Sequence, residues 1–160
     1  MDDREFSRLV GLYSGTVYRV AYCHIGNSAD ADDIMQDVFL ALYTYNKDFR
    51  DDEHVKAWLI RVAVNRSRNL LNSCRYRLSQ PLETAENIPA ETDKGGFLLP
   101  VVMKLKPKYR TVLYMYYYEG YSVSEIAAAL SEKTTTVTTR LSRGRDRLKE
   151  LLIKEGYYEL

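Results

Sequence analysis

The chain has 160 residues, enough for one medium-sized domain or two small ones. No apolar run approaches the length of a membrane-spanning helix, so direct insertion into a membrane is not expected. The first ten residues, MDDREFSRLV, lack the pattern of a secretory signal, which favours a cytoplasmic protein.

Charge is unevenly distributed, although the net charge is only +1. Residues 56–77 contain basic side chains and no acid, and residues 133–149 are similarly basic. Acids concentrate at residues 30–37 and again at residues 79–96. The pattern indicates two basic surfaces, one acidic surface and an acidic linker.

The linker also marks the division of the chain. Residues 79–96 combine prolines, glycines and acids with little apolar periodicity, which is typical of a flexible connection. Helical periodicity is present on both sides of it, and strand-like alternation does not persist anywhere. We therefore predict an all-α fold with two small helical domains, residues 1–78 and 97–160, joined by a flexible acidic linker.

The apolar spacing before the linker predicts three helices. They are expected at residues 6–21 and 34–42 and from Val55 to about Arg75, separated by a turn at 26–28 and a polar loop at 46–54. Residues 57–64 of the third helix are almost wholly apolar and are expected to be buried, with Trp58 in the core.

The second predicted helix has an acidic face. The helix dipole accounts for Asp30 and Asp32 at its N-terminus, but not for Asp37. One face carries Asp33, Gln36, Asp37 and Leu40. This face is either simply solvated or suited to docking on a basic protein helix, and its spacing does not match a calcium loop.

The third predicted helix has a polar stripe without acids, formed by Arg61, Asn65, Arg68, Asn72 and Arg75. A solvated face usually mixes in glutamate and lysine. Arginine and asparagine are the side chains that offer bidentate hydrogen bonds to phosphates and bases. The stripe therefore favours nucleic-acid binding over simple solvation.

After the linker, a short helix is expected at residues 97–105 and a longer one from Pro107 to Gly120. The second of these carries tyrosines at positions 114 and 116–118. In a small domain short of aliphatic bulk, these rings are expected to pack in the core.

The segment that follows has the form of a helix-turn-helix. Ser122 and Glu125 form a capping box that predicts a helix start at Val123. Apolar periodicity stops at residues 131–134 and resumes at Thr135. The second helix then has one face for packing, with Val137, Leu141, Gly144, Leu148 and Leu152, and another with Arg140, Arg143 and Arg147. An ordinary amphipathic helix with a solvated basic face is the alternative, but the capped helix and tight turn before it favour DNA binding.

Cysteine and histidine do not suggest a cofactor or metal site. Cys23 and Cys74 are far apart and lack metal-ligand spacing, and Cys23 is expected in the core. His24 and His54 likewise have no partner at ligand spacing.

Several segments together resemble the extracytoplasmic-function group of bacterial sigma factors. The first half, with ADADDIMQDVFLALY and AWLIRVAVNRSRNLL, is similar to region two of that family. The second half, with LKPKYRTVLYMYYYEGYSVSEIAAAL and TVTTRLSRGRDRL, is similar to region four. The pieces occur in the family's order and spacing and cover nearly the whole chain outside the linker.

The resemblance implies roles for particular residues. Core RNA polymerase would be contacted by Asp33, Gln36, Asp37 and Phe39. The minus-ten promoter element would be bound by Arg61, Asn65, Arg66, Arg68 and Asn69, with a flipped base held by the loop at 46–54. The minus-thirty-five element would be read by Thr136, Thr139, Arg140 and Arg143. The polymerase would perform the chemistry, so no catalytic residue is expected.

The resemblance also implies partners: core RNA polymerase, promoter DNA and an inhibitory anti-sigma factor. The chain departs from the family pattern at three positions. The family usually has Gly or Asp where Ser131 stands, Gly where Thr135 stands, and a basic residue where Thr138 stands. Fewer phosphate contacts are therefore expected early in the second helix of the helix-turn-helix.

A stand-alone helix-turn-helix regulator is the alternative function, but such proteins usually dimerise and no dimerisation helix is evident. A helical module that binds only protein is a third hypothesis, which the arginine-rich faces disfavour.

Overall fold

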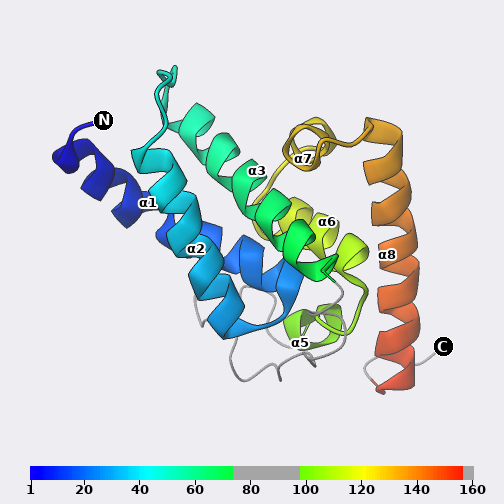
Figure 1. The fold of residues 1–160 in the computed structure, drawn as a ribbon. Helices are drawn as coiled ribbons and strands as arrows, with labels where there is room; N and C mark the ends of the chain where they lie inside the picture. The colour runs from blue at the N-terminus through cyan, green and yellow to red at the C-terminus, as the bar shows by residue number, and fades with distance from the viewer. Residues whose placement is uncertain (74–97, 157–160) are drawn as a thin grey trace. The chain divides into compact units, whose positions relative to one another are not determined.

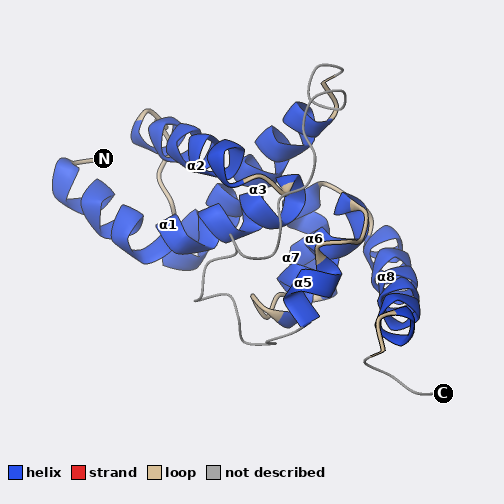
Figure 2. Cartoon of the chain, turned by 90° about the horizontal axis from the view of Figure 1, so that it is seen from below, coloured by secondary structure: helices blue, strands red, loops and turns tan. Residues whose placement is uncertain are grey.

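The computed structural model describes residues 1–73 and 98–156 (Figure 1). These residues form helices joined by short connections, with no β-strand among them (Figure 2). The chain divides into two compact units, and three of the described helices fall in the first and four in the second. The predicted all-α fold with two helical domains is confirmed. The predicted linker, residues 79–96, lies outside the described residues.

The first unit is a three-helix bundle. Its helices are α1 (Asp3–Ile25), α2 (Ser28–Tyr43) and α3 (Asp52–Leu71), and each packs against the other two. A side chain before each helix accepts a backbone N–H of the first turn, namely Asp2, Asn27 and Asp51. Gly26 adopts the left-handed conformation with φ of 76° and ends α1, which confirms the predicted turn.

The core of this bundle is aliphatic. Its fully buried side chains include Val17, Ala21, Val38, Leu42, Leu59 and Ala63. Burying each of the larger ones contributes roughly 1.5–3 kcal/mol. The prediction that residues 57–64 are wholly buried is wrong: Ala57 and Arg61 are exposed and Trp58 is half-buried. In a bundle of three helices only one side of α3 faces the others.

The boundaries of α3 also differ from the prediction. Asp51 caps the helix by accepting the backbone N–H of His54 at 2.8 Å, so the helix starts at Asp52 and not at Val55. The preceding loop is correspondingly shorter than predicted. The C-terminal end of α3 is Leu71, and Arg75 of the predicted polar stripe lies outside the described residues.

The second unit contains α5 (Leu98–Val102), α6 (Pro107–Tyr117), α7 (Val123–Leu130) and α8 (Thr134–Lys154). The last of these packs against the other three. Arg110 is 1% exposed, and its guanidinium donates to the carbonyl of Leu105 at 3.0 Å. This hydrogen bond offsets part of the free-energy cost of burying the Arg110 charge, and it links α6 to the turn after α5.

The helix-turn-helix forms where it was predicted. Both hydrogen bonds of the Ser122–Glu125 capping box are present, at 3.1 Å each, and α7 starts at Val123 as expected. In α8, Gly144 faces α6 so closely that an added Cβ would lie 3.2 Å from Leu113 Cδ1. The absence of a side chain at this position allows α8 to cross α6 at short range.

The tyrosines of α6 only partly follow the prediction. Tyr114 is buried, but Tyr116 is 37% exposed and Tyr117 is 57% exposed. The expected packing of these two rings in the core is therefore wrong. Instead, the Arg145 guanidinium lies over both rings and donates to the Tyr117 hydroxyl at 2.6 Å.

Ser131 ends α7 in the left-handed conformation, with φ of 55° and ψ of 42°. A Cβ is unfavourable there, so we expect Ser131→Gly to stabilise the second unit by roughly 0.5–1 kcal/mol. Denaturant unfolding combined with hydrogen exchange of α7 and α8 amides would measure the gain. Ser131→Ala keeps the Cβ and serves as the control; equal stability of the Gly and Ala variants would refute the strain argument.

Candidate nucleic-acid interface

The predicted minus-ten residues lie on the outer side of α3. Arg61, Asn65, Arg66 and Asn69 are exposed, and Arg68 is half-buried. The opposite side is anchored by Ser67, which is fully buried and donates to the Ala63 carbonyl at 2.7 Å. The five side chains therefore form one open surface that is rich in hydrogen-bond donors and has no acid within it. We call this surface the α3 stripe.

An acidic surface on α2 adjoins the α3 stripe. Asp33, Gln36 and Asp37 are exposed, and Leu40 among them is 64% exposed. We call these four residues the α2 face. The Asp37 carboxylate lies 3.9 Å from the Arg66 guanidinium, with both side chains largely solvated. Such a pair contributes little stability, so either partner is available to other molecules.

Phe39 does not belong to the α2 face. It is 6% exposed, and its ring makes an edge contact with Phe6 of α1 at 6.4 Å between centroids. The prediction that Phe39 contacts a partner directly does not fit this position, because the ring packs inside the bundle. The exposed Leu40 is the apolar residue that the helix offers to a partner.

Aromatic side chains support the loop between α2 and α3. The Tyr45 and Phe49 rings stack at 5.2 Å, and the Trp58 ring lies 4.8 Å from Tyr45. His54 accepts the Arg50 backbone N–H at 3.1 Å and lies edge-on to Phe49. Trp58 therefore supports the loop from α3 and does not occupy the core position predicted for it. This cluster gives a short polar loop a defined shape.

A pocket of about 550 Å³ lies between this loop and the N-terminal end of α1. Its lining includes Met1, Glu5, Tyr45, Asn46, Phe49 and Asp52. The pocket is large enough for a nucleotide base, and it offers aromatic surface together with carboxylate and amide acceptors. Such groups are suited to stack on a base and to accept hydrogen bonds from its amino groups.

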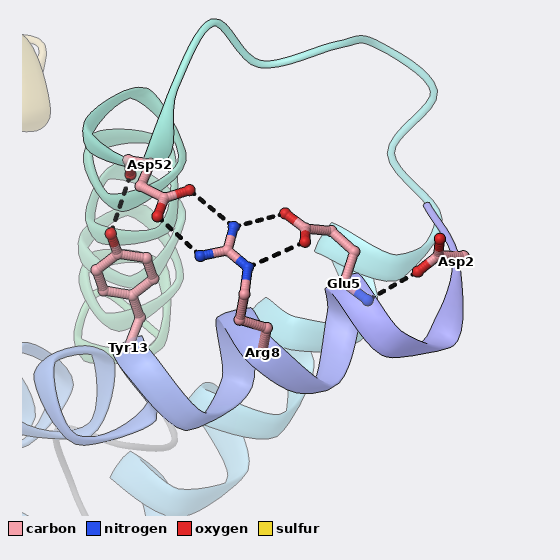
Figure 3. A network of polar contacts seen from close by, with 5 residues as sticks. All are labelled: Asp2, Glu5, Arg8, Tyr13 and Asp52. Carbon is pink, nitrogen blue, oxygen red and sulfur yellow. Dashed lines mark hydrogen bonds and ion pairs between the residues drawn. The ribbon is translucent and has the colours of Figure 1, made fainter.

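One arginine network joins the two sides of this pocket (Figure 3). The Arg8 guanidinium donates to both carboxylate oxygens of Asp52 at 2.8 and 2.9 Å, and to those of Glu5 at 2.6 and 3.0 Å. The Tyr13 hydroxyl donates to the Asp52 carbonyl at 3.2 Å. The network therefore fastens the start of α3, and with it the end of the loop, to α1.

The predicted minus-thirty-five residues converge on a second pocket. Thr136, Thr139, Arg140 and Arg143 of α8 all line an open concavity of about 280 Å³. Its remaining lining comes from Thr135 and, on α6, from Lys108 and Tyr109. We call this concavity the α8 pocket. Its hydroxyl groups and cations match the requirements of phosphate and base-edge contacts.

Sequence reasoning missed three groups at this site: Lys108 and Tyr109, which line the α8 pocket, and Glu132, which contacts one of its arginines. Glu132 in the turn accepts a hydrogen bond from the Arg140 guanidinium at 3.2 Å. Tyr109 is 3% exposed and carries two cations over its ring. Burial raises the pKa of its hydroxyl, but the neighbouring Arg147 and Lys108 outweigh burial and lower the pKa overall. Only the folded arrangement brings these groups together.

Other kinds of site find no support in residues 1–73 and 98–156. Within these ranges, no group of histidine, cysteine or acidic side chains is arranged to hold a metal ion. None of the helices described there is long and apolar enough to span a membrane. Cys23 is 3% exposed, in the core position expected for it.

Comparison with known proteins identifies the family. The family model for Sigma-70 region 2 matches residues 9–75, and that for Sigma-70, region 4 matches residues 99–148. The ECF RNA polymerase sigma factor SigW of Bacillus subtilis (strain 168) is 26% identical over 169 residues, covering 94% of this chain and 90% of SigW.

Two solved structures are similar to the chain. CnrH, solved in complex with the cytosolic domain of CnrY, is 27% identical with a TM-score of 0.69, covering 97% of this chain and 92% of CnrH. RpoE from Bartonella quintana, solved with the anti-sigma factor NepR, shares the fold at 21% identity and a TM-score of 0.67, covering 93% of this chain and 97% of RpoE. The chain belongs to the extracytoplasmic-function (ECF) group of RNA polymerase sigma factors.

The arginine network predicts a pH dependence of stability. Hydrogen bonds from Arg8 lower the pKa of Asp52 from its ordinary 3.8 and that of Glu5 from 4.5. The resulting stabilisation is fully present above these ordinary values and is lost as pH falls through the lower folded values. We therefore expect Asp52→Asn to lower the thermal stability of the first unit at pH 7, with the gap to wild type closing below about pH 4.

Thermal unfolding followed from pH 7 to pH 3 would test this expectation. Asp48→Asn is the matched control, because Asp48 lies in the same loop region and makes no contact with Arg8. A gap between Asp52→Asn and wild type that stays constant with pH would show that the carboxylate charge is not what stabilises the junction.

Proposed function

We propose that the protein is an alternative sigma factor that binds core RNA polymerase and directs it to promoters with two separated elements. The observation that carries this proposal is the presence of two basic surfaces, the α3 stripe and the α8 pocket, one on each helical unit. The polymerase performs the chemistry, so the chain acts as an initiation factor in the cytoplasm and not as an enzyme.

The α2 face is the proposed contact with core polymerase. Asp33, Gln36 and Asp37 offer acceptors to a basic partner helix, and the exposed Leu40 adds an apolar contact at the same place. Complementary charge of this kind steers association and fixes register. Phe39 supports the face from below by packing against Phe6.

The first unit is the proposed minus-ten reader. The α3 stripe would hold the backbone and bases of this element through arginine and asparagine donors. The pocket beside the loop would hold a base extruded from the duplex, which requires both stacking surface and hydrogen-bond acceptors. Residues 1–78 would then form the domain for polymerase and minus-ten binding.

The second unit is the proposed minus-thirty-five reader. As the second helix of a helix-turn-helix, α8 would enter the major groove with Thr136, Thr139, Arg140 and Arg143 toward the DNA. Residues 97–160 would form this domain. Residues 79–96 would link the two domains and run through the polymerase cleft, where acidic charge resembles that of RNA.

We also propose an inhibitory protein partner. The solved relative from Bartonella quintana is bound to an anti-sigma factor. A partner of this kind would act by covering surfaces that the polymerase requires, and the α2 face is the exposed acidic surface available for such competition.

Run-off transcription on a fragmented genomic library would test the function directly. Core polymerase with this protein should produce discrete start sites that core polymerase alone does not, and aligned upstream sequences should reveal two promoter boxes. Binding of defined DNA by the protein alone, without new starts, would favour a stand-alone helix-turn-helix regulator.

Asp37→Arg should weaken binding to core polymerase at least tenfold, about 1.4 kcal/mol, because it opposes a like charge to a basic partner. The fold should survive, since the Asp37–Arg66 pair is solvated. Affinity for core polymerase would be measured by fluorescence anisotropy. Asp146→Arg makes the same charge change at an exposed position of α8 and is the control; equal losses in both variants would exclude a specific role for Asp37.

Arg143→Ala should reduce transcription from promoters that depend on the minus-thirty-five box, by roughly 1–3 kcal/mol if Arg143 contacts base edges. Arg145→Ala is the control, because Arg145 engages Tyr117 and does not line the α8 pocket. Initiation would be compared on intact and scrambled upstream boxes. An equal loss on both would assign Arg143 to phosphate or to the fold.

A further inference from the structure

Two residues of the α8 pocket come from outside the recognition helix. Lys108 and Tyr109 lie in the first turn of α6 and complete the lining opposite Thr136, Thr139 and Arg143. The buried Tyr109 ring has Lys108 Nζ at 5.0 Å from its centre and the Arg147 guanidinium at 5.1 Å. Cations held over a tyrosine ring have a restricted position, so the ring orders both side chains.

These cations lack acidic partners. Among the described residues, Lys108, Arg143 and Arg147 make no ion pair with a carboxylate, whereas Arg140 is paired with Glu132. Lys108 and Arg143 line the concavity, and Arg147 lies beside it over the Tyr109 ring. Like charges gathered in this way repel each other, and an anion bound there relieves the repulsion. The lowered pKa of the Tyr109 hydroxyl reports the same positive potential.

The recognition helix itself provides little charge at this end. From Thr134 to Thr139 it has hydroxyl groups and a valine, and its first cation is Arg140. Fewer phosphate contacts are therefore expected from the first turns of α8 itself. Of the lysines beside this end of the helix, Lys133 at the N-cap does not line the α8 pocket, whereas Lys108 does. Lys108, which approaches the pocket from α6, is positioned to supply a phosphate contact.

We propose that Lys108 binds a backbone phosphate of the minus-thirty-five DNA, so that α6 contributes a sequence-independent anchor beside the base-reading residues of α8. The inference rests on the proposed function and adds a residue to it. DNA is the favoured ligand because the pocket also contains the hydroxyl and guanidinium groups of a helix-turn-helix recognition helix. Lysine suits this role because its ammonium is a compact point charge.

The test is promoter binding by the full chain in complex with core polymerase, measured from 50 to about 300 mM salt. Fragments with an intact or a scrambled minus-thirty-five box are compared. Lys108→Ala should weaken binding about three- to tenfold on both fragments and reduce the slope of log affinity against log salt by about 0.9. Lys108→Arg should restore both quantities, because it restores the charge.

Lys106→Ala is the matched control. Lys106 is exposed and lies two residues away, but it does not line the α8 pocket. It should keep the wild-type slope. A Lys108→Ala variant that behaves like Lys106→Ala would overturn the inference, and so would weaker binding without a change in slope.

Two further outcomes separate the inference from the function on which it rests. If Lys108→Ala lowers affinity for core polymerase and not for DNA, the pocket binds an acidic protein surface and the inference is overturned. If wild-type holoenzyme shows no promoter binding at all, the proposed function fails and the inference fails with it.

Discussion

The close crossing of α6 and α8 at Gly144 is the constraint on which the DNA-facing surface of the second unit depends. A side chain there would press on Leu113 and Tyr109, so the helices meet at this distance only because glycine has no Cβ. The contact buries the apolar side of α8 and leaves its arginines outward. It also brings Lys108 and Tyr109 to the α8 pocket. Packing and function are thus determined by the same contact.

In the first unit, a charged network positions the DNA-facing helix, whereas in the second unit a small residue, Gly144, does so. Its three helices leave one side of α3 uncovered, and the α3 stripe occupies that side. The loop at the start of α3 is short and polar, and it is held by Arg8 from α1 and by rings packed on Trp58. Each unit therefore has an apolar core, an outward polar helix face, and one contact that positions this face: Arg8 with Asp52 in the first unit and Gly144 against α6 in the second. For a sigma factor, two such units provide two promoter contacts from one chain.

Sequence reasoning succeeded where interactions are local. The capping box at Ser122 involves residues three apart, and it located the start of α7 to the residue. The start of α3 was misplaced because the role of Asp51 as a cap was not recognised. Residues brought together by tertiary packing could not be predicted: Arg8 and Asp52 are separated by 44 positions, and Lys108 reaches the α8 pocket from another helix. Apolar periodicity agreed with the interior position of Phe39, to which only the resemblance assigned a direct partner contact. Periodicity gave no means of assigning Tyr117 to the surface.

The central claim is that this chain recognises promoters as a subunit of RNA polymerase and not on its own. Footprinting of one promoter fragment with the free protein and with the protein bound to core polymerase tests this claim most directly. The account predicts protection of both promoter elements by the complex, and little specific protection by the free protein at the same concentration. Equally strong protection by the free protein would contradict the account and identify an independent DNA-binding regulator.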